Sequence, residues 1–136
     1  MLECLILGDS IAKGVSDIRK ECVAYVQSGI NSYDYVNRLI LNTNGNTEAK
    51  TIIISLGSND LANLNTFEEL DTMRQLVKAN KVYWILPNIK ETKRKAVWEI
   101  ARKYGDWVID ARGYDRSPDT VHPTYNGYKN IAKDTK

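Results

Sequence analysis

The sequence feature that most constrains the fold is the uninterrupted apolar run Ile52-Ile53-Ile54. A strand with one face in water alternates apolar and polar residues, whereas a strand covered on both faces is apolar throughout. We therefore expect this run to lie inside a sheet that has helices on both sides. It belongs to a series of short apolar runs, which are Leu2–Leu7, Val23–Val26, Thr51–Leu56, Lys81–Leu86 and Trp107–Ile109.

Segments with a helical period separate these runs. Thr66-Phe67-Glu68-Glu69 has the pattern of a capping box, which predicts that a helix begins at Thr66. A last helix is expected from Thr124, and another after Ser32. The helix after Ser32 is indicated by Val36, Leu39 and Ile40, and the last helix is expected to carry Tyr128, Ile131 and Ala132 inward. Two further sets each fall on one helix face: Phe67, Leu70, Met73 and Val77; and Ala96, Val97, Ile100, Ala101 and Tyr104, with Gly105 ending that helix.

Alternation of strands and helices predicts an α/β fold, with a three-layer α/β/α sandwich built on a five-stranded parallel sheet. The chain has 136 residues, which suits a single domain over residues 1–136 and is long enough to bury a core. Hydrophobic residues make up 43% and charged residues 26% of the chain, as in ordinary soluble globular proteins.

Charge and hydropathy exclude several classes of function. The net charge of +2 is too weak to indicate a nucleic-acid partner. No apolar run approaches the roughly 20 residues that span a membrane, so no membrane partner is expected. The N-terminus has neither a basic region nor a long apolar run, so we expect no leader peptide and a cytoplasmic location by default. A virus-encoded or virion-associated protein would have the same features.

The two cysteines, Cys4 and Cys22, lack the spacing of metal ligands. Cys4 falls inside the first apolar run, where we expect a buried thiol. On this interpretation nothing in the sequence requires an oxidising compartment.

Polar segments follow each expected strand, and the carboxyl ends of parallel strands meet at one edge of a sheet, where ligands bind. Ser10 and Asn59 follow the first and third strands, and Gly29 follows the second. Asp119 and His122 come after the fifth. Pro87-Asn88 follows the fourth strand. We therefore expect all five segments to converge at one edge of the sheet.

The expected convergence supplies the parts of a serine nucleophile. Such a nucleophile needs a base within hydrogen-bond reach and a group that orients the base. His122 is the only histidine of the chain, and Asp119 lies three residues before it. Pro123 would keep His122 out of helical geometry. We predict Ser10 as nucleophile, His122 as base and Asp119 as the orienting carboxylate.

Acyl transfer also needs donors aimed at the developing oxyanion. The candidates are the backbone N–H groups of Ser10 and Gly29 and the side-chain amide of Asn59. Glycine at position 29 would leave its N–H open to approach.

At these residues the sequence resembles the SGNH hydrolases, also called GDSL-type esterases and lipases. Four blocks carry the resemblance: Gly-Asp-Ser at 8–10, Gly29 within Gln-Ser-Gly-Ile-Asn at 27–31, Gly-Ser-Asn-Asp at 57–60 and Asp-Thr-Val-His-Pro at 119–123. The resemblance implies a flavodoxin-like SGNH hydrolase fold and hydrolysis of an ester or thioester without metal or organic cofactor. The second block lacks the asparagine that often precedes its glycine, and the chain is shorter than most members, which implies trimmed loops around the acyl group.

Each of these residues also has a simpler structural role. Ser10 can be a helix cap or turn residue, and Asn59 and Gly29 can be turn residues. Asp9 and Asp60 are expected to bind loop amides rather than to act in catalysis. The cationic cluster Lys90, Lys93, Arg94 and Lys95 is expected to be a solvated helix face, and Trp84 and Trp107 to lie in or near the core; Tyr33, Asn88 and Tyr125 are candidates for lining the substrate cleft.

The function predicted from these residues is that of a serine esterase with an open, shallow site. An open site suits a small acyl group on a large carrier, so we expect acetyl removal from a carbohydrate or a similar acylated small molecule. A lipase or thioesterase for longer acyl chains is the nearest alternative, although no apolar lid is visible. A catalytically silent carbohydrate-binding module on the same fold is an alternative of another class, and a mononucleotide binder lacks its glycine-rich fingerprint.

Overall fold

The five expected strands form one parallel sheet in the computed structural model, which describes residues 1–136. The strands lie in the order β2-β1-β3-β4-β5, which confirms the predicted parallel sheet. Their bounds are β1 Leu2–Gly8, β2 Val23–Val26, β3 Glu48–Ser55, β4 Lys78–Leu86 and β5 Trp107–Asp110. β3 and β4 begin earlier than their apolar runs, because their first residues pair with each other at the sheet's amino-terminal end, where Glu48 lies beside Lys78.

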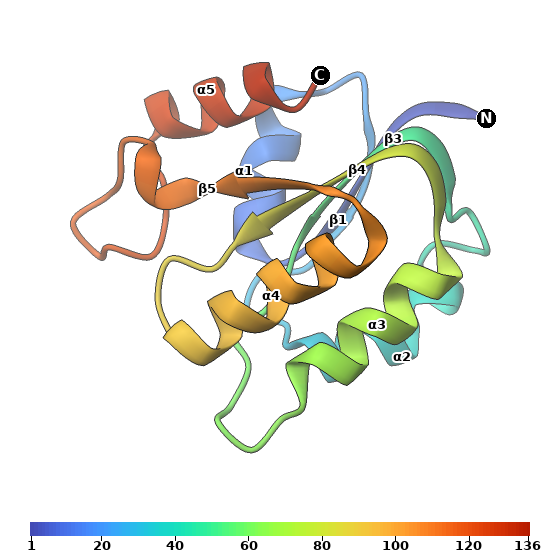
Figure 1. The fold of residues 1–136 in the computed structure, drawn as a ribbon. Coiled ribbons are helices and arrows are strands. Elements are labelled where there is room, and N and C mark those ends of the chain that lie inside the picture. Colours follow the sequence, from blue (N-terminus) through green and yellow to red (C-terminus); the bar gives the residue numbers. More distant parts are fainter.

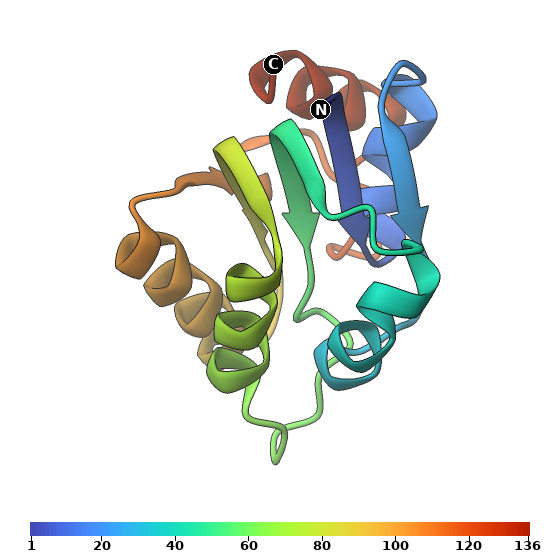
Figure 2. The ribbon, with the colours of Figure 1, turned by 90° about the vertical axis from the view of Figure 1, so that its right-hand side faces the viewer.

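Helices cover both faces of the sheet, as the three-layer prediction requires (Figure 1). The helices are α1 Ser10–Ile18, α2 Ser32–Asn42, α3 Thr66–Leu76, α4 Glu91–Tyr104 and α5 Tyr125–Asp134, with a short 3-10 helix η1 at Ala111–Gly113. The turned view of Figure 2 shows α1 and α5 together on one side of the sheet and α2, α3 and α4 on the other. None of these helices has the length and hydrophobicity needed to cross a membrane.

Alternate side chains of the central strands pack into two separate hydrophobic cores, one on each face of the sheet. Ile52 and Ile54 belong to the larger cluster beneath α2, α3 and α4, whereas Ile53 belongs to the smaller cluster beneath α1 and α5. All three isoleucines are fully buried. The uninterrupted apolar run is therefore explained by burial on both faces of the sheet.

The helix expected at Thr66 begins there, but Thr66 is not the N-cap that the capping-box pattern implied. Asn65 is the N-cap, and its side-chain oxygen accepts a hydrogen bond from the Glu68 N–H at 3.2 Å. The Thr66 hydroxyl instead donates to Asp60 at 2.7 Å. Sequence pattern places a helix start to within a residue, because neighbouring polar residues compete for the cap.

The prediction that the cationic cluster is a solvated face is wrong for two of its four members, Lys93 and Arg94. Lys93 is only 5% exposed, and its ammonium group donates to the Leu64 carbonyl at 2.7 Å. Lys90 donates to the Asp60 carbonyl at 3.0 Å, and Arg94 binds both the Pro87 carbonyl and the Asp110 carboxylate. Lys90 and Lys95 are exposed, as expected. Lys90, Lys93 and Arg94 tie α4 to the loops at the carboxyl ends of β3 and β4.

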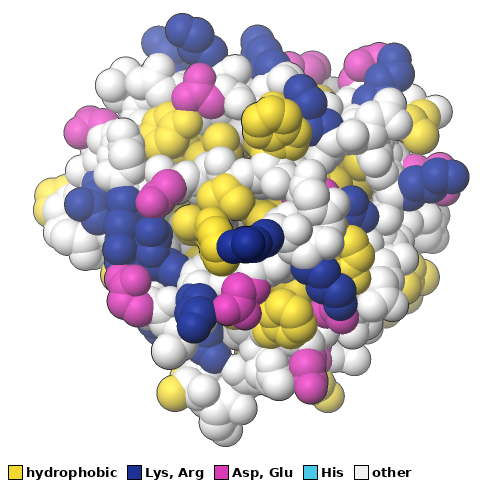
Figure 3. Space-filling model, viewed as in Figure 1, with side chains coloured by type: hydrophobic (Ala, Val, Ile, Leu, Met, Phe, Trp, Pro, Cys, Tyr) yellow, Lys and Arg dark blue, Asp and Glu magenta, His cyan; other side chains and the backbone are white.

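The two tryptophans differ in their surroundings. Trp84 in the interior strand β4 is fully buried, as expected, whereas Trp107 is 60% exposed, so the prediction is wrong for it. Trp107 begins β5, an edge strand, and there its ring lies beside Tyr83 and Lys81. The face around α4 and β5 carries apolar patches between charges of both signs (Figure 3).

A disulfide replaces the free thiol expected at Cys4. Cys4 in β1 is bonded to Cys22, just before β2, and the chain has no free cysteine. The guanidinium group of Arg19, itself buried, lies 3.7 Å from the Cys4 sulfur and donates to the Thr135 carbonyl at 2.8 Å. The bond thus lies where β1, β2 and the C-terminal end of α5 come together.

Candidate active site

Ser10 lies where β1 ends and α1 begins. Gly8 has a φ of +136°, and a Cβ there would lie 1.9 Å from the Ser55 carbonyl oxygen, so only glycine allows β1 and β3 to approach this closely. Asp9 is the N-cap of α1, accepting from the N–H of Ile11 at 3.0 Å. Ser10 is therefore the first helical residue rather than the cap, and its side chain is free for another partner.

The junction falls at the point where the strand order reverses, between β1 and β3. In open parallel sheets this switch point is where ligands bind. The neighbouring strands end at the same level, because the Gln27 N–H donates to the Gly8 carbonyl at 2.9 Å and the Asp9 N–H to the Ser55 carbonyl at 3.0 Å. The segments carrying Gly29 and Asn59 consequently leave the sheet on either side of Ser10.

Ser10, His122 and Asp119 form a continuous hydrogen-bonded chain. The Ser10 Oγ lies 2.8 Å from His122 Nε2, and His122 Nδ1 lies 2.8 Å from Asp119 Oδ2. An ionised carboxylate only accepts hydrogen bonds, so Nδ1 carries the ring proton of the neutral imidazole. Nε2 is then the acceptor facing the Ser10 hydroxyl, which is the arrangement that a serine nucleophile and its base require.

Asp119 is fixed by its own backbone. Its Oδ1 accepts from the N–H groups of Val121 and His122, both at 2.9 Å. The backbone N–H of His122, the imidazole and the backbone N–H of Val121 together lower the pKa of the Asp119 carboxyl to about 2. Asp119 is thus ionised and held in one orientation, although half of its side chain is exposed.

The predicted oxyanion donors lie on three segments, which follow the carboxyl ends of β1, β2 and β3. The Ser10 N–H is at the first position of α1, where a helix leaves its N–H groups without intrahelical partners. Gly29 has a φ of +80°, nothing lies within 4 Å of where its Cβ would be, and its N–H makes no hydrogen bond within the chain. The amide of Asn59 donates to the Ile30 carbonyl at 3.1 Å, which holds it beside the Gly29 segment and leaves its second N–H free.

Asp60 joins the Asn59 loop to two helices. It is fully buried, and its carboxylate accepts from the Ser32 N–H and the Thr66 hydroxyl, both at 2.7 Å. The expected structural role of Asp60 is therefore confirmed, and so is that of Asp9, which binds the first amides of α1. Both carboxylates hold the loops that carry the candidate site.

Asn88 has a role that the sequence did not reveal. It is 2% exposed, so it does not line an open cleft; its amide donates to the Val121 carbonyl at 2.8 Å. Val121 lies between Asp119 and His122, in the long loop between η1 and α5. The bond therefore fastens that loop to the end of β4. The one signal in the sequence was the position of Asn88 directly after an expected strand, which placed it at the edge of the sheet where the candidate site lies. Tyr33 and Tyr125, the other cleft candidates, are 55% and 71% exposed.

The candidate site is open to solvent. The His122 side chain is 38% exposed. Ser10, Asp119 and His122 line none of the main surface hollows, which have volumes of about 300 to 500 Å³. No group of three or more His, Cys, Asp or Glu side chains is arranged to hold a metal ion.

Comparison with known proteins rests on structure, because no protein-family model and no curated protein sequence matches the chain. Among solved structures, a GDSL-like lipase from Bacteroides thetaiotaomicron is 17% identical, with a TM-score of 0.71 over 97% of this chain and 84% of that one. A carbohydrate acetylesterase family member from Sinorhizobium meliloti is 11% identical, with a TM-score of 0.70 over 96% and 94%.

A third similar structure is the C-terminal catalytic domain of a peptidoglycan O-acetyltransferase from Streptococcus pneumoniae. It is 17% identical, with a TM-score of 0.60 over 98% of this chain and 96% of that one. The chain thus has the fold of the GDSL-type, or SGNH, hydrolases, and the fold implied by the sequence resemblance is confirmed.

Proposed function

We propose that this protein is a serine esterase of the GDSL type, which removes a small acyl group, such as acetyl, from a carbohydrate or similar carrier. The observation that carries the proposal is the chain of two 2.8 Å hydrogen bonds from Ser10 through His122 to Asp119. It stands at the switch point of a sheet whose fold is shared with GDSL-like lipases and a carbohydrate acetylesterase family member.

The proposed reaction proceeds through an acyl-enzyme. The Ser10 Oγ attacks the ester carbonyl while His122 Nε2 takes the hydroxyl proton, and His122 then returns that proton to the leaving alcohol. Asp119 keeps the imidazole in the required tautomer and stabilises the imidazolium. The N–H groups of Ser10, Gly29 and Asn59 stabilise the oxyanion. Water, activated by His122, releases the acid and restores Ser10.

The openness of the site favours a short acyl group. A long acyl chain gains affinity by burying its methylene groups, at about 0.8 kcal/mol for each. Ser10 lines none of the main hollows, so none of them is placed at its hydroxyl to bury such a chain. A lipase or thioesterase for long chains is therefore the less favoured of the two esterase functions.

The test compares hydrolysis of the acetate, butyrate and octanoate esters of p-nitrophenol. We expect the highest kcat/KM with the acetate, and a loss of about 10³-fold or more in the Ser10→Ala variant. Ser16→Ala is the matched control, because Ser16 lies on the same helix and its hydroxyl only binds the Lys13 carbonyl. Absence of activity, together with no labelling of Ser10 by a fluorophosphonate, would contradict the proposal. A preference for octanoate would favour the lipase alternative.

A further inference from the structure

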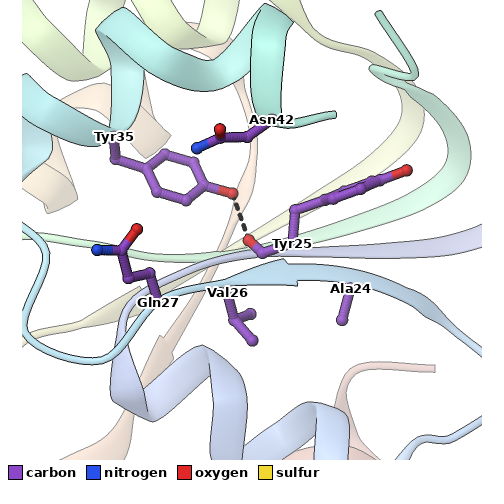
Figure 4. Close-up of a pocket in the computed structure, with 6 residues that line it drawn as sticks. All are labelled: Ala24, Tyr25, Val26, Gln27, Tyr35 and Asn42. Atoms are coloured by element: carbon purple, nitrogen blue, oxygen red, sulfur yellow. Dashed lines mark hydrogen bonds between the residues drawn. The ribbon is translucent and has the colours of Figure 1, made fainter. Parts of the chain in front are cut away.

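An unassigned hollow of about 400 Å³ lies along the free edge of β2, beside α2 (Figure 4). We call it the β2-edge hollow. It is lined by Ala24, Tyr25, Val26, Gln27, Tyr35 and Asn42. Gln27 is two residues from Gly29 in the chain, so one end of the hollow adjoins the segment that carries the proposed oxyanion donor. The other end lies at Asn42, the last residue of α2.

The backbone of β2 offers unused hydrogen-bonding groups to this hollow. β2 pairs only with β1, and the Gln27 N–H points to the Gly8 carbonyl. In a parallel pair, alternate residues bond to the neighbouring strand and the residues between them face away. The N–H and C=O groups of Ala24 and Val26 therefore face the open edge, where they supply both donors and acceptors.

None of the six lining residues is charged: Gln27 and Asn42 are amides, Tyr25 and Tyr35 are aromatic, and Ala24 and Val26 are small aliphatic residues of β2. The side-chain amides of Gln27 and Asn42 are exposed. Tyr25 presents a half-buried ring, which lies edge-on in Figure 4 with its hydroxyl directed away from β2. The Tyr35 hydroxyl is already used, because it donates to the Tyr25 carbonyl at 2.6 Å and so fixes this wall of the hollow.

Uncharged donors and acceptors beside an aromatic ring match a particular ligand chemistry. A sugar hydroxyl both donates and accepts, and the C–H face of a pyranose ring is apolar enough to pack on a tyrosine. A charged ligand would find no counter-charge among the lining residues, and an acyl chain would leave the free edge groups of β2 without partners. The lining therefore favours a neutral, hydroxyl-rich ligand.

We propose that the β2-edge hollow binds a neutral sugar unit of an oligosaccharide carrier, next to the sugar whose acetyl ester reaches Ser10. That the bound sugar belongs to the ester substrate rests on the esterase function proposed above. Binding of a sugar in the hollow does not depend on that function and can be tested separately. The hollow would hold the carrier, while the open site around Ser10 receives only the acetyl group.

A kinetic test uses the Gln27→Ala/Asn42→Ala double variant with two substrates, acetylated xylo-oligosaccharides and p-nitrophenyl acetate. Loss of two hydrogen bonds to the sugar predicts that the ratio of kcat/KM for the oligosaccharides to kcat/KM for p-nitrophenyl acetate falls about tenfold, mainly through KM. Asn130→Ala is the matched control, since Asn130 is an exposed amide on α5 outside the hollow. An unchanged ratio in the double variant would overturn the proposal.

A binding test separates this proposal from the esterase function. Xylotetraose and tetra-N-acetylchitotetraose are titrated into the Ser10→Ala protein, and backbone amide shifts are followed by NMR. We expect saturable shifts at residues 24–27 and 42 with at least one of the two sugars, and their loss in the double variant. Binding without any hydrolysis by the wild type would leave the hollow assigned and remove the esterase proposal. No shift at these residues with either sugar would overturn the assignment of the hollow.

Discussion

At the scale of single residues, Asp119 and Asp9 show how one fold gives two carboxylates opposite properties. Asp119 is exposed but surrounded by N–H donors, which lower its pKa to about 2. Asp9 is completely buried, and burial raises its pKa to about 6 in spite of the hydrogen bonds from α1. One of its oxygens, Oδ2, has no hydrogen-bond partner. The first carboxylate is suited to permanent ionisation, whereas the second is ionised at neutral pH only at a cost in stability.

Asp119→Asn is expected to lower kcat for p-nitrophenyl acetate by about 10³-fold with little change in KM. The amide no longer fixes the imidazole in the tautomer whose Nε2 accepts the Ser10 proton. Because Asp119 keeps its charge down to about pH 2, its titration leaves the activity of the wild type unaffected above about pH 4. Steady-state kinetics of both proteins check this, and an activity of Asp119→Asn close to that of the wild type would contradict the role.

Asp9→Asn is expected to change how stability depends on pH. The pKa of Asp9 is higher in the folded chain than its ordinary value of 3.8, so the folded state binds this proton more tightly. This tighter proton binding adds to the free energy of unfolding. The added stability is fully present below about pH 4 and is lost as the pH rises through about 6, a difference of about 3 kcal/mol. Urea unfolding at about pH 4 and about pH 8 measures the difference for each protein. We expect the loss of unfolding free energy between these two pH values to be smaller in Asp9→Asn than in the wild type, by most of the roughly 3 kcal/mol given above. Equal losses in both proteins would disprove the role of Asp9.

At the scale of elements, the loop between η1 and α5 carries two of the three proposed catalytic residues without regular secondary structure of its own. Its shape depends on a few contacts: the Ser117 N–H donates to the His122 carbonyl at 2.8 Å, Arg116 pairs with Pro123, and Asn88 holds Val121. Of these, only the bond from Asn88 links this stretch of the loop to the sheet. The position of His122 relative to Ser10 therefore depends on a strand that contributes no residue to the proposed chemistry.

Asn88→Ala is expected to leave the Val121 carbonyl unpaired and to lower the free energy of unfolding by about 1–3 kcal/mol. Displacement of the His122 loop should lower kcat for p-nitrophenyl acetate by about 10- to 100-fold in the protein that is still folded. Circular dichroism verifies folding before the kinetics are measured. Asn88→Asp, which keeps the side-chain shape but removes the donor, should lose a similar factor in kcat. Full activity in both variants would show that the loop holds its place without Asn88.

The helices and strands could be predicted from the sequence because short apolar and capping patterns determine them. The five proposed site residues could be named because they lie in short motifs that follow strand ends. Ser10, Gly29, Asn59, Asp119 and His122 all lie directly after strands or beside a turn, where chain order fixes the edge of the sheet to which they belong. What could not be predicted depends on contacts between distant segments. The buried lysine Lys93 finds its carbonyl partner at Leu64, on another loop. Trp107 is exposed because β5 is an edge strand, which strand order alone decides.

At the scale of the whole molecule, the disulfide joins the two strands at the end of the sheet opposite to Ser10. Cys4 and Cys22 are 18 residues apart in the chain, with all of α1 between them. The bond encloses Ser10 and its helix in one covalent loop. It also bears on the compartment: the expectation that no oxidising environment is required rested on free thiols, and the pairing removes that basis.

Reduction of the disulfide is expected to lower the free energy of unfolding by about 3 kcal/mol, from the entropy of a loop of this length in the unfolded chain. Urea unfolding with and without dithiothreitol measures this difference, and Cys4→Ser/Cys22→Ser should reproduce it. The double variant is its own control, because dithiothreitol should no longer change its stability. Two reactive thiols in the untreated, denatured protein would contradict the pairing.

The partly exposed position of Ser10, His122 and Asp119, outside every main hollow, has a consequence for the proposed reaction if the carrier is a polymer. A site of this kind does not need a chain end, since the polymer does not have to thread into a tunnel. An esterase of the proposed kind would release acetate from interior positions and leave the degree of polymerisation unchanged. Solution viscosity would then stay constant while acetate accumulates, and the bared hydroxyl groups would become accessible to enzymes that cleave the polymer backbone.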